Sequence, residues 1–413
     1  MIIKRDYYLQ QLISSKSNNL IKIVTGIRRS GKSFLLFNLF HNHLIETGIS
    51  EDHIIEIALD DRLNKNLRDP DVILQHIHER IVDDKLYYII LDEVQMIDEF
   101  TDVLNSLLHI RNADVYVTGS NSKFLSKDVV TEFRGRGDEI HLFPLSFAEL
   151  YNSIGGDKFE LWKRYYTYGG LPGILELDSE KKKAAYLRSL HETVYLKDII
   201  ERNNLKNREE FMELMRVMAS CIGSPCNPSK LENTFKSVKN ETLDRKTISK
   251  YLSYMEDAFL IEKSMRYDIK GRKYIGTLSK YYFQDIGLRN ALLNFRQVEE
   301  NHIMENVIYN ELRLRGFCVD VGMVEARTAK ERKQLEVDFV ANMADRRYYI
   351  QSAFAMPDDD KREQESASLK RIDDSFKKII IMRDDIKPYH NNNGFYIVGL
   401  MDFLLKPDLI EQL

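Results

Sequence analysis

Apolar and polar residues alternate in two different rhythms over the first 150 residues. Short runs of apolar and β-branched residues predict strands, and longer runs with apolar residues every three or four positions predict helices. The predicted strands are residues 20–25, 54–59, 87–91 and 114–118, and the predicted helices are 33–44, 72–82 and 100–110. The strand YYIIL at 87–91 is apolar on both faces. This rhythm predicts the α/β class, with a parallel sheet covered by helices on both sides.

The pattern changes after residue 146. Residues 146–216 are mainly helical, and residues 217–290 mix short helices with a hairpin. A helix from about residue 300 to 315 then leads into four predicted strands, at 318–322, 335–341, 348–353 and 378–382. We therefore expect four domains, with the bounds 1–150, 151–216, 217–292 and 293–413.

Composition and charge narrow the class of protein and its location. Hydrophobic residues make up 43% of the chain and charged residues 30%, as in globular proteins, and no apolar run is long enough to cross a bilayer. The three cysteines, Cys221, Cys226 and Cys318, indicate a reducing compartment and lack the spacing of a zinc site. We expect a cytoplasmic protein with no membrane partner. The net charge of −4 excludes an overall basic coat but allows local basic patches.

The segment GIRRSGKS, residues 26–33, matches the phosphate-binding pattern G-x-x-x-x-G-K-[ST]. It follows a predicted strand and opens a predicted helix, which is the context that this pattern requires. We expect its backbone N–H groups to surround the phosphates of ATP, with Lys32 on the β- and γ-phosphates and Ser33 on Mg²⁺. The predicted nucleotide-binding residues are Gly26, Ile27, Arg28, Arg29, Ser30, Gly31, Lys32, Ser33 and Phe34.

Two acids, Asp92 and Glu93, follow the apolar strand at 87–91. Ligands of open α/β sheets bind at the carboxyl ends of the strands. We expect Asp92 to hold Mg²⁺, directly or through water, and Glu93 to polarise the water that attacks ATP. The alternative is a strand that ends in two acids by coincidence.

Polar residues after the next strand are further catalytic candidates. Ser120 or Asn121 would orient the attacking water and sense the γ-phosphate, unless they only form a turn. In FRGRG, residues 133–137, we expect Arg136 to complete the site of a neighbouring subunit as an arginine finger. The alternative for Arg136 is a surface loop, and the prediction of a homo-oligomer depends on this residue alone.

This order of elements resembles the AAA-type ATPases, in particular a branch of bacterial and archaeal ATP-binding proteins whose C-terminal half is a domain of unknown function. The segments that carry the resemblance are GIRRSGKS, IILDEVQ (89–95), VYVTGSNS (115–122), the GR of FRGRG, FPLSFAEL (143–150), YGGLP (168–172), TVYLKDIIER (193–202) and KYYFQDIGLRNA (280–291). The resemblance spans nearly the whole chain. It implies ATP binding, hydrolysis, a helical lid at 151–216 and a winged helix at 217–292, and it leaves the biological role open.

Arg28 and Arg29 stand side by side in the phosphate-binding loop. In loops of this family the intervening positions bow away from the phosphates, which implies that both side chains face outward. They would then cover the loop backbone and pair with acids on the adjacent surface. The alternative is that they supply a cation to the lid, to a partner subunit or to the sugar and base of the nucleotide.

Basic residues are concentrated in residues 228–280, where 12 Lys and Arg face 7 Asp and Glu. Residues 244–252 resemble the second helix of a helix-turn-helix, and 260–265 with 273–278 predict a wing hairpin. A winged helix places these two elements on the major groove and the phosphates of double-stranded DNA. The alternative is packing or contact with a protein partner. The predicted DNA-binding residues are Arg245, Lys246, Ser249, Lys250, Lys270, Arg272 and Lys273.

Residues 293–413 resemble the PD-(D/E)XK nuclease fold. Such sites combine a helix acid, a strand acid and an acid-x-Lys pair on the next strand. Glu305, Asp338 and Gln351 fall at the acid positions, and Ala353 replaces the lysine. Lys361, Lys377 and Lys378 are candidates to replace it from elsewhere. We expect a degenerate site that serves as a binding platform.

The leading hypothesis is therefore a Mg²⁺-dependent ATPase, which cleaves a phosphoanhydride bond of ATP, with a C-terminal half that contacts DNA or a protein partner. One alternative is a signalling scaffold that binds ATP and rarely hydrolyses it, against which the intact Glu93 argues. A second alternative is an ATP-gated, metal-dependent nuclease, against which Ala353 argues.

Overall fold

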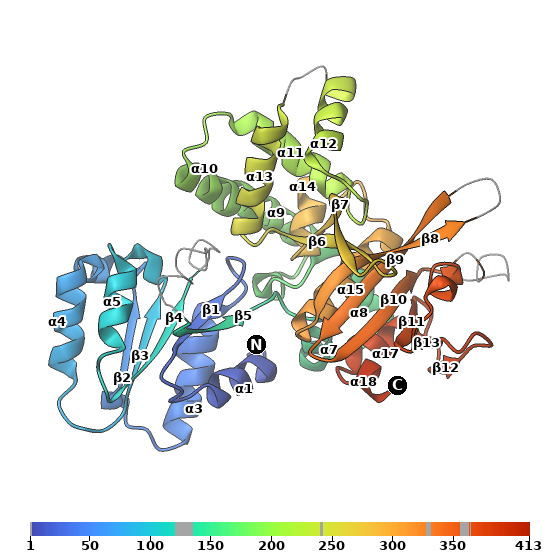
Figure 1. Ribbon diagram of the computed structural model, residues 1–413. Helices are drawn as coiled ribbons and strands as arrows, with labels where there is room; N and C mark the ends of the chain where they lie inside the picture. Colours follow the sequence, from blue (N-terminus) through green and yellow to red (C-terminus); the bar gives the residue numbers. More distant parts are fainter. Residues whose placement is uncertain (1, 120–134, 240–242, 328–331, 356–362, 364) are drawn as a thin grey trace. The chain divides into compact units, whose positions relative to one another are not determined.

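The structure, a computed structural model, describes residues 2–119, 135–239, 243–327, 332–355, 363 and 365–413 (Figure 1). The candidate residues Ser120, Asn121 and Lys361 lie outside the described residues. Contacts divide the chain into two units, and each is described here by itself. The first unit is Met1–Leu145 with Leu171–Gly173 and Asp257–Phe259, and the second is Ser146–Gly170, Ile174–Glu256 and Leu260–Leu413. The finer division into four domains stays a prediction.

A parallel sheet of five strands, in the order β2-β3-β4-β1-β5, forms the centre of the first unit. Its strands are β1 (Ile21–Thr25), β2 (Ile54–Ala58), β3 (Tyr87–Asp92), β4 (Ala113–Thr118) and β5 (Gly137–His141). The four predicted strands and the α/β class are confirmed. The edge strand β5 was not predicted, because Ile140 is its only buried residue and the strand has no apolar pattern.

Helices cover both faces of this sheet (Figure 1). Helices α4 (Pro70–Arg80) and α5 (Phe100–Leu107) pack on one face, with Ile73 and Leu104 in the core. The other face is covered by α1 (Asp6–Ser14) and by a continuous helical segment that begins at Lys32, near the end of the loop 26–33. The remaining helical segments are α2 (Lys32–Phe34), η1 (Leu35–Phe40), α3 (His41–Glu46), η2 (Glu51–His53), η3 (Arg62–Arg68) and η4 (Val94–Met96).

A mixed sheet of eight strands, in the order β12-β13-β11-β10-β9-β8-β6-β7, organises the second unit. Its strands are β6 (Ile261–Asp268), β7 (Lys273–Phe283), β8 (Cys318–Arg327), β9 (Arg332–Met343), β10 (Arg346–Ala353), β11 (Lys377–Met382), β12 (Tyr389–His390) and β13 (Tyr396–Gly399). The antiparallel hairpin predicted as a wing is β6–β7, and β6 pairs in parallel with β8. The hairpin is therefore part of the C-terminal sheet.

The helices of the second unit share one large apolar core with this sheet. Helices α7 (Phe147–Ile154) and α8 (Lys158–Tyr168) contribute Phe147 and Trp162 to the core that α15 (Glu300–Leu314) lines with Ile308. The short η6 (Pro172–Ile174) spans the boundary between the units. The other helical segments are α9 (Glu180–Leu190), η7 (His191–Leu196), α10 (Lys197–Asn203), α11 (Arg208–Ser220), α12 (Pro228–Thr234), η8 (Phe235–Lys239), α13 (Arg245–Asp257), α14 (Ile286–Leu292), η9 (Leu369–Arg371), α17 (Leu400–Leu405) and α18 (Leu409–Gln412). Within the described part of the chain, no helix has the length and apolarity needed to cross a membrane.

Two of the segments that carry the family resemblance, YGGLP and KYYFQDIGLRNA, pack against each other. The carboxylate of Asp285 accepts a hydrogen bond from the backbone N–H of Gly170 at 2.8 Å. A Cβ atom on Gly287 would lie 2.0 Å from the carbonyl oxygen of Tyr168. Glycine at position 287 therefore lets the start of α14 approach the end of α8, which gives both segments a structural role.

Candidate functional site

The loop between β1 and α2 follows a path that only glycine allows at two positions. Gly26 has φ +133°, and a Cβ atom there would lie 2.2 Å from the carbonyl oxygen of Leu142. Gly31, with φ +101°, precedes the helix that begins at Lys32. The first N–H groups of a helix have no partner inside it, so they form a ready site for an anion.

Lys32 is buried against this loop, with 5% of its surface exposed. Its Nζ donates to the carbonyl oxygens of Gly26 at 3.0 Å and Ile27 at 3.2 Å. Burial lowers the pKa of Lys32 to about 8, although the carboxylates of Glu93 and Asp92 oppose this shift. A desolvated ammonium beside free N–H groups is suited to the phosphates of a nucleotide.

Asp92 and Ser33 lie together at the end of β3. The Asp92 carboxylate is only 3% exposed, and the Ser33 hydroxyl lies beside it. Burial raises the pKa of Asp92, and the hydroxyls of Thr118 and Ser33 oppose that rise. A hydroxyl and a carboxylate are hard oxygen ligands of the kind that Mg²⁺ prefers. The structure thus brings together the two residues that the sequence predicted as Mg²⁺ ligands, and this donor set fits the ion.

Thr118, the last residue of β4, connects the two acids and was not predicted. Its Oγ1 donates to Asp92 Oδ1 and accepts from the backbone N–H of Glu93 at 2.9 Å. Glu93 is half-buried with φ +54°, a left-handed conformation that is uncommon outside glycine, and its carboxylate accepts from Gln95. The polar end of the strand DVYVT was a sequence signal for Thr118. The sequence analysis instead selected Ser120 and Asn121, which follow this strand, as catalytic candidates.

The remaining residues of the loop differ in exposure. Ile27 and Ser30 are buried, and Ser30 Oγ has no hydrogen-bond partner among the described residues. Arg28 is half-buried, and its charge helps to lower the pKa of Lys32. Arg29 is exposed, with φ +66°. The two arginines therefore occupy different environments, and only Arg28 lies near the Lys32 ammonium. Phe34, one turn into the helix, is exposed.

Arg5 supports the loop from the start of the chain, and no sequence pattern indicated it. Its guanidinium donates to the carbonyl oxygens of Phe143 at 2.7 Å and Ser30 at 3.2 Å, and it lies 4.6 Å from the ring centre of Tyr8. Arg136, the candidate finger, is exposed just before β5, where its carbonyl oxygen accepts from the Ile21 N–H at 2.9 Å.

Comparison with known proteins adds to this geometry. Residues 18–151 match the family described as AAA domain, and residues 159–299 match a domain of unknown function (DUF8612). An uncharacterised protein of Haemophilus influenzae is 33% identical over 414 residues, which cover 98% of this chain and 99% of the relative. The chain belongs to this family of AAA-domain proteins. Its first unit is thus an AAA-type P-loop domain, the predicted nucleotide-binding fold.

Two further matches are more distant. An uncharacterised protein of the archaeon Methanocaldococcus jannaschii is 29% identical over 428 residues, covering 99% of this chain and 89% of the relative. Among solved structures, the Orc1 protein of Aeropyrum pernix in complex with DNA is 12% identical, with a TM-score of 0.30. That match covers 71% of this chain and 92% of the Orc1 chain, and its TM-score is too low to bear on function.

The predicted DNA-binding residues of this AAA-domain protein lie on helix α13 and on the β6–β7 turn. On α13, the side chains of Ile248 and Leu252 are buried, as predicted. The four candidates of this helix, Arg245, Lys246, Ser249 and Lys250, are exposed. The three candidates of the turn, Lys270, Arg272 and Lys273, are exposed as well.

The nuclease-like acids surround a lysine that the sequence analysis did not consider. Lys280 on β7 is 2% exposed, and its Nζ lies 2.8 Å from Glu305, 2.7 Å from Glu336 and 3.8 Å from Asp338. Gln351 accepts a long hydrogen bond, 3.4 Å, from the backbone N–H of Asp338. Among the described residues, no group of three or more His, Cys, Asp or Glu side chains is arranged to hold a metal ion.

Of the lysines proposed as replacements, Lys378 on β11 donates to the carbonyl oxygen of Asp374 at 2.9 Å. Lys361 lies outside the described residues. Lys280 reaches the acids from the hairpin β6–β7, which was interpreted as a wing. In the sheet order, β8 and β6 lie between β7 and β9, the strand that carries Glu336 and Asp338. The sequence analysis assigned the wing and the nuclease-like acids to different domains, so it did not predict the contact between Lys280 and these acids.

Proposed function

We propose that this chain binds ATP with Mg²⁺ and hydrolyses it at the site formed by the loop 26–33, Asp92 and Glu93. The observation that carries the proposal is the contact between Ser33 and Asp92 beside the buried ammonium of Lys32. These groups supply a positive charge, helix N–H donors and two oxygen ligands within one site. AAA-domain membership supports the same function.

Each residue has a defined role in this proposal. Lys32 and the N–H groups at the start of α2 bind the β- and γ-phosphates and balance their charge. Ser33 and Asp92 would hold Mg²⁺, which would supply positive charge to stabilise the negative charge that develops in the transition state. Glu93 accepts a hydrogen bond from the attacking water and so orients and polarises it. Thr118 positions Glu93 and Asp92 through its two hydrogen bonds.

We further propose that Arg136 and the C-terminal half act on partners. An exposed arginine at the edge of the AAA domain suits a finger that completes the site of a second copy in a homo-oligomer. The exposed cations of α13 suit double-stranded DNA, and the same surface serves a protein partner in the alternative. Mixing an Arg136→Ala chain with a Glu93→Gln chain tests the finger. In a mixed oligomer, the Glu93→Gln chain can supply Arg136 to the intact Glu93 site of the Arg136→Ala chain. Recovered ATP hydrolysis supports it, and no recovery opposes it.

The direct experiment is the steady-state rate of ATP hydrolysis with and without duplex DNA, at low and moderate salt. Glu93→Gln should abolish turnover, whereas Glu99→Gln should not. Glu99 is a matched control because it is exposed and has a similar backbone conformation, φ +50°. Stimulation that fades with salt would support DNA contact. Very slow Glu93-dependent turnover that DNA does not change would favour the ATP-binding scaffold.

The nuclease alternative makes a separate prediction. It requires nicking of plasmid DNA with Mg²⁺ or Mn²⁺ that Asp338→Ala abolishes. We expect intact plasmid, because the Lys280 ammonium already neutralises part of the charge on Glu305 and Glu336.

A further inference from the structure

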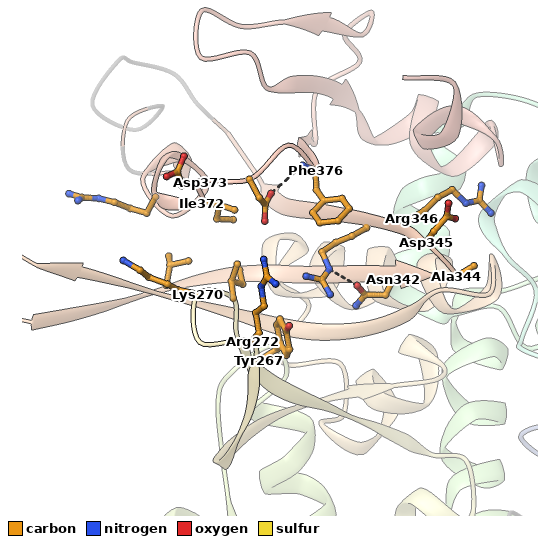
Figure 2. A pocket seen from close by; sticks show the side chains of 15 residues that line it. Tyr267, Lys270, Arg272, Asn342, Ala344, Asp345, Arg346, Ile372, Asp373 and Phe376 are labelled. Carbon is orange, nitrogen blue, oxygen red and sulfur yellow. Dashed lines mark hydrogen bonds between the residues drawn. The ribbon is translucent and has the colours of Figure 1, made fainter.

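A pocket of about 560 Å³ lies within the second unit, beside the β6–β7 turn. Figure 2 shows its side chains on two opposing walls, with Lys270 and Arg272 on one wall and Ile372 and Phe376 on the other. Its volume lies within the roughly 300–1,000 Å³ that small-molecule sites occupy. None of the functions proposed above explains this pocket.

Positive charge predominates in the pocket, where five cations face three acids. Lys270, Arg272 and Arg371 take part in no ion pair with any other described residue, whereas Arg346 pairs with Glu411 at 2.5 Å. All three side chains are exposed, and together they concentrate positive charge along the pocket, which attracts anions. These three residues therefore favour an anion as the ligand.

The three acids are not equivalent. Asp374 already accepts hydrogen bonds from the Tyr349 hydroxyl at 2.7 Å and from the Phe376 N–H at 3.2 Å. Asp345 lies beside Arg346, away from Lys270, as Figure 2 shows. Asp373 remains near the cationic end and limits how many phosphates that end can accept.

A flat platform lies beside the cations. The guanidinium of Arg347 lies 5.4 Å from the ring centre of Tyr267 and 5.3 Å from that of Phe376. Its Nε donates to Asn342 Oδ1 at 2.7 Å, which fixes the plane of the group. Phe376 is 39% exposed, so part of its ring is open to a ligand. Guanidinium and aromatic planes are the surfaces on which unstacked nucleic-acid bases pack.

We propose that this pocket binds one nucleotide of a single-stranded nucleic acid, with its phosphate at Lys270, Arg272 and Arg371 and its base against Phe376 and Arg347. The proposal deepens the nucleic-acid contact proposed above and rests on it. The bases of a duplex are stacked inside the helix and cannot enter a pocket, whereas those of a single strand can. The exposed Lys273, next to Arg272, extends the positive charge beyond the pocket, which suits a strand better than a free nucleotide.

The test is the affinity of the full chain for a labelled oligothymidylate and for a labelled duplex of equal length, measured by fluorescence anisotropy at several salt concentrations. Phe376→Ala should weaken single-strand binding roughly 5- to 100-fold, the range for loss of one stacked base. The double variant Lys270→Gln, Arg272→Gln should lower the slope of log affinity against log salt by up to about 0.7, the value for loss of one phosphate contact with a single strand. Duplex binding should change less in both variants.

The control variant is Lys181→Gln, Lys206→Gln, which removes two exposed lysines of the same unit outside the pocket. Single-strand affinity that falls no more in the pocket variants than in this control would overturn the proposal. So would an unchanged affinity for the strand together with a loss of duplex binding. Free thymidine monophosphate, added as a competitor, distinguishes a free nucleotide from a strand as the ligand of the pocket. If it displaces the oligothymidylate at concentrations comparable to that of the strand, the pocket binds free nucleotides and the proposal of a single-stranded ligand fails.

The same measurements separate this proposal from the others. Lys246→Gln with Lys250→Gln on α13 should weaken duplex binding and leave the pocket-dependent strand binding intact. If neither strand nor duplex binds, the nucleic-acid contact itself fails. If duplex binding depends on α13 but strand binding does not depend on the pocket, the pocket proposal fails alone. ATP hydrolysis should persist in every pocket variant.

Discussion

The ammonium of Lys280 on β7 lies 2.8 Å from a carboxylate oxygen of Glu305 on α15. The same oxygen accepts from the Tyr282 hydroxyl at 2.8 Å. This buried ion pair joins the hairpin predicted as a wing to the acids of the nuclease-like domain. Removing one partner of a buried pair leaves the other charge desolvated and unbalanced.

Lys280→Met should therefore destabilise the second unit by about 3–5 kcal/mol. The measurement is the urea midpoint of the chain, followed by a signal from Trp162, which lies in the core of that unit. Lys263→Met on the neighbouring strand removes an exposed lysine and should change the free energy of unfolding by less than about 0.5 kcal/mol. Equal effects of the two substitutions would show that the Lys280 pair contributes nothing to stability.

Asp338 should make the stability of the second unit depend on pH. Burial, and then the neighbouring Glu305 carboxylate, raise the pKa of Asp338 to about 8, while Lys280 opposes the rise. The folded state then holds a proton that the unfolded state releases between about pH 4 and pH 8, so the free energy of unfolding falls as pH rises through that range. Asp338→Asn should flatten this dependence in urea titrations at a series of pH values. An unchanged slope in Asp338→Asn would contradict the assignment.

Thr118→Val should reduce kcat for ATP hydrolysis roughly 10- to 100-fold, the usual effect of losing a residue that orients a metal ligand. Valine keeps the volume but removes the hydroxyl that bonds both Asp92 and the Glu93 N–H. Thr118→Ser retains the hydroxyl and should restore most of the rate. The Mg²⁺ concentration for half-maximal activity should rise in Thr118→Val and not in Thr118→Ser, which a purely structural effect would not produce.

Gly26→Ala should disrupt the phosphate-binding loop and abolish ATP binding, because the new Cβ would lie 2.2 Å from the Leu142 carbonyl oxygen. Gly48→Ala is the matched control. Gly48 also has positive φ, +89°, but a Cβ atom there meets nothing within 4 Å. The control thus shares the backbone strain and lacks the clash. ATP titrations of both variants, with thermal unfolding, distinguish the two effects, and intact binding by Gly26→Ala would rule out the described loop geometry.

Proton uptake on ATP binding should report the state of Lys32. Its pKa is lowered to about 8 in the free chain, mainly by burial, and phosphates favour its charged form. ATP binding above pH 8 should therefore take up a proton, and the affinity should fall as pH rises further. Calorimetry in two buffers of different ionisation enthalpy measures the uptake, and Lys32→Met should abolish it. An uptake that persists in Lys32→Met would assign the proton to another group.

Local patterns in the sequence were enough to predict the AAA domain, and long-range pairings were not. The strand before Gly26 and the acids at the end of β3 follow from periodicity and motif, because each signal lies in one short segment. Arg5 and Lys280 act through partners far away in the chain, so no local pattern marks them. Thr118 also acts through distant partners, and the polar ending of its strand was its only local signal. The hairpin β6–β7 was predicted as strands, but its place in the eight-stranded sheet depends on pairing with β8, which local periodicity does not encode.

The central claim is that Glu93 activates water for hydrolysis of an ATP bound at Lys32, Ser33 and Asp92. A single-turnover experiment tests it most directly: excess chain is mixed with labelled Mg·ATP, and both bound nucleotide and released phosphate are followed. We predict that the wild-type chain and Glu93→Gln bind the nucleotide with similar affinity and that only the wild-type chain releases phosphate. Phosphate release by Glu93→Gln at the wild-type rate, or tight ATP binding by the wild-type chain without any release, would contradict the account.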